Sequence, residues 1–384
     1  MGTKRFIPVC EPTLIGNEAK YVNDCLKTNW ISSAGKYIGM FENKFAKYCN
    51  TKYGISACNG TASIHLALEA LGIGPGDEVI VPDFTMIASA NSIIYTGAKP
   101  VFVDADIETW CLNPRLIEEK ITKKTKAIMP VHIYGHPCDM DPIIKIAGKY
   151  NLSIVEDAAE AHGALYKGKK CGSLSDAASF SFYANKIITC GEGGMAVTND
   201  EKLSEKMRLL KNHSFTKNRF IHEEVGYNYR MTNLQAAIGL GQLENIGKLI
   251  RMRINNANLY NKLLRNINGI VLPPSKDWAK NVHWMYGILL KKEFGIAKDR
   301  LREELLKEGI DTRSFFIPLH QQPVFHKKSK KFSNIPDADG RYPVSDKLGI
   351  NGFYLPSTSS LPKEDIIYIT DVIKRVQEKT EKQK

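Results

Sequence analysis

The 384-residue sequence contains eight cysteines but no Cys-x-x-Cys pair. The scattered cysteines indicate neither a zinc site nor a disulfide framework, so we expect free thiols and no bound metal. No stretch approaches the roughly 20 apolar residues of a membrane-spanning helix, and no long apolar segment follows the N-terminal residues. These absences predict a cytoplasmic protein without a membrane partner.

The sequence also lacks a concentrated basic block, an internal repeat and a low-complexity segment. Its formal net charge is +12, but the lysines are distributed along the whole chain. The one local basic run, at 326–331, is typical of a solvated surface loop. We therefore expect no nucleic-acid partner, although a positive field would help to collect an anionic small molecule such as a nucleoside diphosphate.

Short apolar runs bounded by turns alternate with helical patterns over the first two-thirds of the chain. The expected strands are 78–82, 100–104, 126–132 and 152–157, and the expected helices are 85–95, 113–121 and 139–150. This βαβ alternation predicts an α/β fold with a mostly parallel sheet, helices on both faces and ligands at the carboxyl ends of the strands. The proline-free stretch 232–264 predicts one long or kinked helix.

Two chemically informative residues follow expected strands. Lys186 ends the run 179–186, just before a glycine-rich turn, and Asp157 ends a strand 29 residues earlier. Both would lie at the carboxyl edge of the sheet, where a carboxylate and a lysine suit pyridoxal phosphate (PLP). Each signal alone is weak, since such a lysine is usually solvated and such an aspartate usually caps a turn or helix.

A third element joins this pair. Asn59, Gly60, Thr61 and Ser63 precede a helical pattern at 64–71. A glycine turn at a helix N-terminus suits a phosphate, because backbone N–H groups and the helix dipole both favour an anion there. Asn59 or Thr61 acting only as a helix N-cap is the alternative.

Seven ordered motifs carry a family resemblance that runs nearly end to end. They are Asn59-Gly60-Thr61, Pro82-Asp83-Phe84-Thr85, Pro100 to Asp104, Val131 to Gly135, Glu156 to Gly163, Ser181 to Lys186 and Gly226 to Met231. The set resembles the sugar-nucleotide aminotransferases of the aspartate aminotransferase superfamily, the PLP enzymes of fold type I. That resemblance implies a large PLP-binding domain at 1–250 and a smaller C-terminal α/β domain at 251–384. The N-terminal segment belongs either to the large domain or to the small one.

The resemblance also implies residue roles. Lys186 would form the Schiff base with PLP and then move a proton, and Asp157 would pair with the ring nitrogen. The cofactor phosphate would be held by Gly60, Thr61 and Ser181, with Asn228 supplied by the neighbouring subunit of a homodimer with shared active sites.

Two cofactor positions depart from the common family pattern. Glu160 stands near the ring where relatives often carry Gln, and a glutamate there must be paired or protonated. Met86 stands where many relatives stack a Trp or Tyr on the ring, so either Met86 or a neighbouring side chain would cover it; Met86 as helix core is the alternative. His162 would orient Asp157 or serve a structural role.

Trp30, Ser33 and His320 match family segments that line the substrate cleft, although each could equally be a core, turn or solvated residue. The segments 109–112, 135–142 and 186–189 most resemble family members that aminate GDP-4-keto-6-deoxymannose. The resemblance thus implies transfer of an amino group from glutamate to C4 of a nucleotide-linked 4-keto-6-deoxy sugar.

Three alternatives remain open. A UDP- or dTDP-linked 4-aminotransferase, or a 3-aminotransferase, would share the same motifs. A sugar 3-dehydratase of similar fold would carry histidine at the lysine position, so Lys186 argues against it. A scaffold or regulatory protein on this fold would bind no cofactor.

Overall fold

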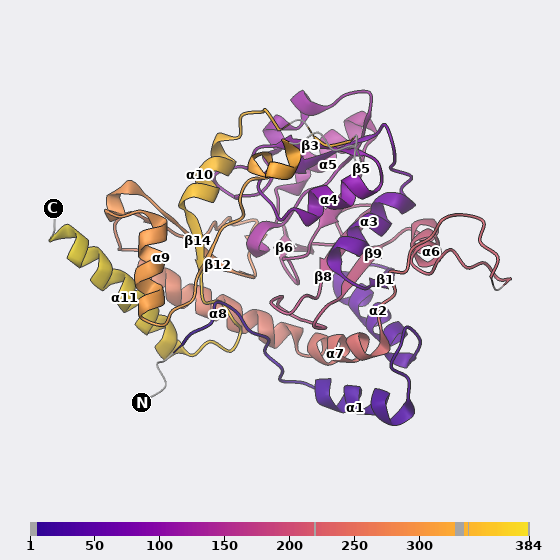
Figure 1. The fold of residues 1–384 in the computed structure, drawn as a ribbon, viewed down its shortest axis with the longest axis horizontal. Helices are drawn as coiled ribbons and strands as arrows, with labels where there is room; N and C mark the ends of the chain where they lie inside the picture. Colours follow the sequence, from indigo (N-terminus) through magenta and orange to yellow (C-terminus); the bar gives the residue numbers. More distant parts are fainter. Residues whose placement is uncertain (1–5, 219, 327–333, 337, 383–384) are drawn as a thin grey trace.

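The computed structural model describes residues 6–218, 220–326, 334–336 and 338–382. Its centre is a seven-stranded sheet with the strand order β1-β9-β8-β5-β4-β2-β3 (Figure 1). Strand β9 pairs antiparallel with β1 and β8, and the other neighbouring strands of this sheet pair parallel. The strands are β1 (Tyr53–Ala57), β2 (Glu78–Pro82), β3 (Lys99–Val103), β4 (Thr125–Ile128), β5 (Ser153–Asp157), β8 (Ala177–Ser181) and β9 (Gly194–Thr198). The predicted mostly parallel sheet is confirmed.

Helices cover both faces of this sheet, and the pattern of burial explains why. Along β2, Ile80 belongs to one buried apolar cluster, whereas Val79 and Val81 belong to another. Successive strand residues point to opposite faces, so a continuous apolar run is stable only when both faces are covered. The helices in this part of the chain are α1 (Glu18–Thr28), α2 (Lys36–Cys49), α3 (Gly60–Ala70), α4 (Ala88–Tyr95), α5 (Met140–Tyr150), α6 (Glu201–Leu210) and α7 (Asn233–Leu243).

A second sheet lies in the C-terminal third, with strand order β10-β12-β14-β13. In Figure 1 it lies with α9 and α11 on the side of the molecule away from α6. The elements are α8 (Ile246–Leu264), β10 (Ile270–Val271), β12 (Tyr286–Leu290), α9 (Lys298–Lys307), β13 (Arg313–Ser314), α10 (Pro343–Asn351), β14 (Gly352–Leu355) and α11 (Lys363–Glu381). The predicted boundary at residue 250 stays a prediction, since α8 runs across it.

Four expected elements differ in detail. The helix expected from residue 85 begins at Ala88, and the segment 113–121 forms two short 3-10 turns, Pro114–Leu116 and Glu118–Lys120. The stretch 232–264 breaks at residues 244–245 into α7 and α8. Most relevant to function, β8 ends at Ser181. Lys186 therefore stands in the turn after the strand rather than at the strand's end.

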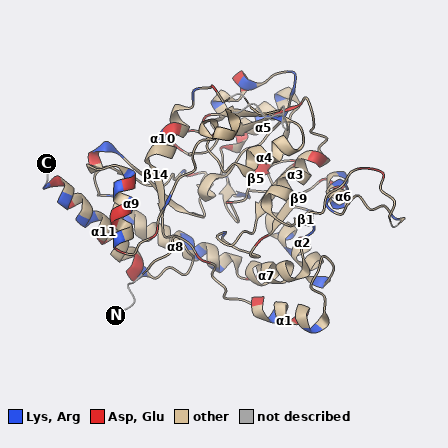
Figure 2. Cartoon of the chain, viewed as in Figure 1, with Lys and Arg blue, Asp and Glu red and all other residues tan. Residues whose placement is uncertain are grey.

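The charged residues are dispersed over the fold, as the sequence analysis expects. Figure 2 shows basic and acidic residues interspersed along α9 and α11. Within the described ranges, no helix has both the length and the apolarity needed to cross a bilayer. Most of the basic run at 326–331 lies outside the described residues.

The aromatic core beneath the first sheet generates a stability prediction. Phe45 is fully buried, and its ring centroid lies 5.0 Å from that of Phe180 and 5.1 Å from that of Phe182. We expect Phe45→Ala to lower the free energy of unfolding in urea by about 3–5 kcal/mol, because the lost contacts leave a cavity. On the surface of α5, Ile144→Ala should change it by less than about 0.5 kcal/mol. Equal losses in the two variants would contradict this packing.

Candidate active site

A cavity of about 520 Å³ opens at the carboxyl ends of the strands. It is lined by residues from separate segments of the chain, among them the residues at and after the ends of β5 and β8 and the first residues of α3. Seven of the eight predicted cofactor residues line it together: Gly60, Thr61, Met86, Asp157, Glu160, Ser181 and Lys186. Parallel pairing of β5 with β8 aligns Asp157 with Ser179 and so brings the two strand ends to one edge.

Each carboxyl oxygen of Asp157 accepts one hydrogen bond. The Ser89 hydroxyl donates to Oδ2 at 2.7 Å, and the backbone N–H of Ala159 donates to Oδ1 at 3.1 Å. Burial raises the pKa of Asp157, and these donors together with Lys186 partly oppose that shift. A cation placed in the cavity beside this carboxylate would favour its charged form.

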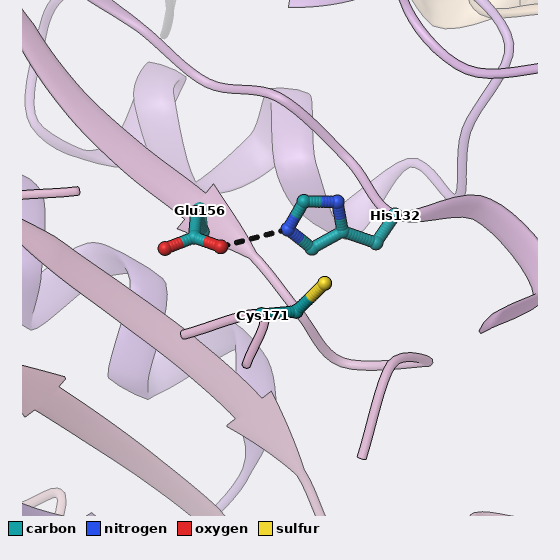
Figure 3. Close-up of side chains that lie close together, drawn as sticks. All are labelled: His132, Glu156 and Cys171. Atoms are coloured by element: carbon teal, nitrogen blue, oxygen red, sulfur yellow. Dashed lines mark hydrogen bonds and ion pairs between the residues drawn. The ribbon is translucent and has the colours of Figure 1, made fainter. Parts of the chain in front are cut away.

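The neighbouring Glu156 points to the other side of β5, where it completes a buried network (Figure 3). His132 Nε2 lies 2.8 Å from Glu156 Oε2, and the backbone N–H of Cys138 donates to His132 Nδ1 at 3.0 Å. Since Nδ1 accepts, the ring proton lies on Nε2 and faces the carboxylate. Figure 3 also places the thiol of Cys171 beside this pair.

Glu156 accepts three further hydrogen bonds, from Gly172 N, Leu174 N and the Ser175 hydroxyl. Burial alone would raise the pKa of Glu156, but the donors hold that pKa below its usual range. Cys171, His132 and Glu156 have the residue types of a metal site. In this structure the His–Glu pair is joined to backbone and hydroxyl donors in one hydrogen-bond network.

Lys186 lies in the turn after β8, with its backbone N–H bonded to the carbonyl of Tyr183. Its side chain is only 10% exposed, and Nζ lies 3.9 Å from Glu160 Oε1. Burial lowers the pKa of Lys186, whereas Glu160 and Asp157 act in the opposite direction. A lysine with a lowered pKa holds more of its amine in the neutral, nucleophilic form.

Each carboxyl oxygen of Glu160 has a partner, as the sequence analysis requires of a glutamate at this position. The backbone N–H of Tyr134 donates to Oε2 at 2.6 Å, and Oε1 faces Lys186. Burial raises the pKa of Glu160 to about 7, even though Lys186 and the Tyr134 N–H favour the carboxylate. The side chain therefore changes its protonation near neutral pH.

The N-terminus of α3 forms one wall of the cavity. Asn59 caps the helix by accepting a hydrogen bond from Ala62 N at 2.8 Å, as the N-cap alternative expected. A Cβ added to Gly60 would lie 2.8 Å from Ser181 Cβ, so glycine allows the helix to reach the end of β8. Capping and an anion cradle are compatible here, because the cap uses the Ala62 N–H while Gly60 and Thr61 line the cavity.

The structure decides between the alternative roles of two side chains near the cofactor region. Met86 is 48% exposed and lines the cavity, so it is not helix core. His162 is fully buried against Phe180 and Phe182, and neither ring nitrogen has a hydrogen-bond partner in the described part of the chain. It makes no hydrogen bond to Asp157, and its role is one of packing.

Four predicted residues are not among those that line the cavity in this single chain. Asn228 is exposed and accepts hydrogen bonds from Arg230 at 3.0 and 2.7 Å. Trp30 and Ser33 are exposed in the loop after α1. His320 places Nδ1 2.7 Å from Asp83 and Nε2 3.2 Å from Asp346.

Several residues of the site escaped the sequence analysis. Ser89, the second residue of α4, donates to Asp157, and Trp284, Phe316 and Tyr354 line the cavity from the C-terminal third. No local motif marks any of them. Only the packing of the second sheet against the first brings the last three to Lys186.

The residues present fit PLP. A helix N-terminus suits the phosphate, a buried carboxylate suits a ring nitrogen that carries a proton, and the lysine amine faces the same cavity. The apolar side chains of Val131 and Phe316 also line the cavity and suit a flat ring.

The shifted pKa of Glu160 predicts pH-dependent stability. An unfolded glutamate ionises near its ordinary pKa of 4.5, whereas the folded side chain ionises near 7. The stability from this group is complete below pH 4.5 and is lost as the pH rises to about 7. Between pH 5 and 8 we expect the cofactor-free wild type to lose about 2 kcal/mol of unfolding free energy relative to Glu160→Gln.

Urea unfolding of both proteins across this pH range provides the measurement. Glu303→Gln, at a side chain 63% exposed, is the matched control and should differ from the wild type by a constant amount. A constant difference for Glu160→Gln as well would refute the assignment.

The chain shows similarity to known proteins over nearly its whole length. Residues 12–374 match the DegT/DnrJ/EryC1/StrS aminotransferase family. A protein named GDP-perosamine synthase from Escherichia coli O157:H7 is 47% identical over 372 residues, covering 96% of this chain and 98% of that protein.

Two solved structures extend the similarity. The PLP form of the putative sugar aminotransferase Spr1654 from Streptococcus pneumoniae has a TM-score of 0.89 at 28% identity, covering 98% of this chain and 100% of that one. DesV of S. venezuelae has a TM-score of 0.86 at 33% identity, covering 96% and 99%. The chain belongs to the DegT/DnrJ/EryC1/StrS aminotransferase family.

Proposed function

We propose that this chain is a PLP-dependent aminotransferase that moves an amino group from glutamate to C4 of GDP-4-keto-6-deoxymannose and so forms GDP-perosamine. The observation that carries the proposal is the convergence of Lys186, Asp157 and the α3 N-terminus on one buried cavity. Family membership supports the reaction type, and the name of the 47% identical relative supports the substrate. The product would serve a surface polysaccharide.

When bound, PLP supplies an electron-accepting ring that stabilises negative charge on the carbon that loses a proton. Gly60, Thr61 and Ser181 would hold its phosphate, and Asp157 would keep its ring nitrogen protonated. The Ser89 hydroxyl fixes the orientation of that carboxylate. Met86 lies at the cavity wall, where its thioether can cover one face of the ring.

Lys186 would hold the cofactor through Nζ and, once released, would carry a proton between the carbon of the amino donor and the C4′ carbon of the cofactor. Burial lowers its pKa and so favours the neutral amine that accepts a proton. Glu160 lies 3.9 Å from Nζ, and with a pKa of about 7 it can gain or lose a proton near neutral pH.

The remaining roles complete the proposal. The active site would be shared in a cytoplasmic homodimer, with Asn228 reaching the cofactor phosphate of the neighbouring subunit. Exposure of Asn228 in the single chain supports this arrangement. Trp30, Ser33 and His320 would bind the sugar nucleotide or shape its cleft.

Replacing the lysine tests the cofactor linkage. We expect Lys186→Ala to lose aminotransferase activity, because no other amine faces the cavity among the described residues, while PLP still binds without a covalent bond. The wild type should show visible absorbance that borohydride removes, and the trapped peptide should contain Lys186. Lys36→Ala, at a side chain 61% exposed, should behave as the wild type. Full turnover by Lys186→Ala would refute the proposal.

A substrate panel tests the nucleotide and the sugar. GDP-, UDP- and dTDP-linked 4-keto-6-deoxy sugars are assayed side by side with glutamate, with Lys186→Ala as the blank. We expect kcat/KM for the GDP-linked sugar to exceed the others by about 100-fold or more, since a site that hydrogen-bonds one base leaves polar groups unpaired with another. A preference for a UDP- or dTDP-linked sugar, or amination at C3, would assign the chain to one of those alternatives. A purified protein that takes up no PLP would point to a scaffold.

A further inference from the structure

The indole of Trp284 contacts both Lys186 and the peptide that carries it. Lys186 Nζ lies 3.7 Å from the centroid of the Trp284 ring. The indole N–H also donates to the carbonyl of Asn185, the residue directly before the lysine, at 2.8 Å. Trp284 is 4% exposed and lines the cavity, so its ring forms a wall beside the reactive amine.

A buried arginine holds the backbone of Trp284. Arg253 is 3% exposed, and its Nη1 donates to the carbonyls of Trp284 and Ser357. Its Nε donates to the Ser359 hydroxyl at 3.1 Å. Charge-assisted hydrogen bonds of this kind are strong and restrict movement, so α8 and the loop after β14 fix the position of Trp284.

A second aromatic ring fixes the side chain. Tyr134 stacks on Trp284 with a centroid separation of 6.2 Å and an interplanar angle of 23°. The same Tyr134 donates its backbone N–H to Glu160. Trp284 therefore belongs to a rigid group that faces Lys186 from one side, while Glu160 faces it from another.

This arrangement matters because a transaminating lysine must leave its cofactor and rejoin it in every cycle. A long, flexible side chain loses rotamer entropy whenever it is confined. An aromatic face attracts an ammonium group most strongly when both are shielded from water. The contact with Trp284 would hold the released amine beside its attachment point.

We propose that Trp284 is a positioning residue that keeps the Lys186 amine in place whenever this amine is not joined to PLP. The inference rests on the proposed function and deepens it. The indole acts on the ammonium through its ring face and on the Asn185–Lys186 peptide through its N–H.

The rival role for Trp284 is that it only shapes the cofactor cavity, and a double-variant design separates the two. Cofactor-free, full-length protein is mixed with PLP, and covalent capture at Lys186 is timed by borohydride trapping and mass spectrometry. The rate is measured below the alkaline plateau, where the ammonium form that the ring attracts is populated. Loss of the ring contact would by itself favour the neutral amine and speed capture, so slower capture reports lost positioning. Noncovalent PLP affinity is measured in parallel in Lys186→Ala and in Lys186→Ala/Trp284→Leu.

We expect Trp284→Leu to slow covalent capture by about tenfold, because it loses both the ring contact and the hydrogen bond to Asn185. Trp284→Phe keeps an aromatic face and should be slowed by only about threefold. In the Lys186→Ala background, Trp284→Leu should change PLP affinity by less than about twofold, since the residue on which Trp284 acts is gone.

Two results would overturn the proposal. One is capture by Trp284→Leu within twofold of the wild-type rate. The other is a loss of PLP affinity in the Lys186→Ala background as large as the loss of capture rate, which would mean that Trp284 holds the cofactor rather than the amine. Circular dichroism and thermal unfolding check that each variant folds, and Trp284→Phe decides the question alone should Trp284→Leu fail to fold.

Failure of the proposed function would look different. In that case the wild type itself would trap no PLP at Lys186. A wild type that captures PLP, together with an unaffected Trp284→Leu, refutes only the positioning role.

Discussion

The parallel pairing of β5 with β8 is the constraint on which the site depends. It aligns Asp157 with Ser179 and directs both strand ends to one edge of the sheet. The turn after β8 then returns Lys186 to the same cavity, within 3.9 Å of Glu160. Three ionisable groups thus share a space from which water is largely excluded, and their pKa values shift because desolvation penalises each charged form.

The two faces of β5 serve different purposes. Asp157 faces the cavity and has two hydrogen-bond donors, whereas Glu156 faces the buried side and has four. The saturated glutamate links β5 to His132 after β4 and to the loop 172–175. All the lone pairs of the Glu156 carboxylate accept hydrogen bonds within the protein, and these bonds stabilise the strand. The less saturated aspartate keeps capacity for a partner in the cavity.

The sequence predicted those parts of the fold that depend on local pattern. Alternating apolar runs predicted the parallel sheet, and a glycine turn before a helical pattern predicted the α3 N-terminus beside the cavity. The helix expected at 113–121 was wrong, because Pro114 and its neighbours close only 3-10 turns. Ordered motifs sufficed to predict that seven of the candidate cofactor residues share one cavity, since each lies at or after the end of a strand at the same edge.

Contacts between distant segments were not predictable in this way. Trp284 meets Lys186 across 98 positions of sequence, and its location is set by Arg253 and by the packing of Tyr134. The ion pair of His320 with Asp83 likewise joins residues 237 positions apart. A lone histidine in a loop carries no signal of such a partner. The pKa of Glu160 depends on depth of burial, which residue types alone do not report.

Helix α8 has a mechanical consequence. Its first turns, with Leu249 and Ile250, belong to the core beneath the large sheet, and its later turns, with Tyr260 and Leu264, belong to the core of the second sheet. A sharp bend in the middle of an unbroken helix costs free energy, because backbone hydrogen bonds would have to break. Any tilt of the second sheet would therefore be transmitted along α8 to the large sheet. Arg253 lies between the two ends of this helix and bonds the backbone of Trp284, so the indole beside the amine would move with the helix.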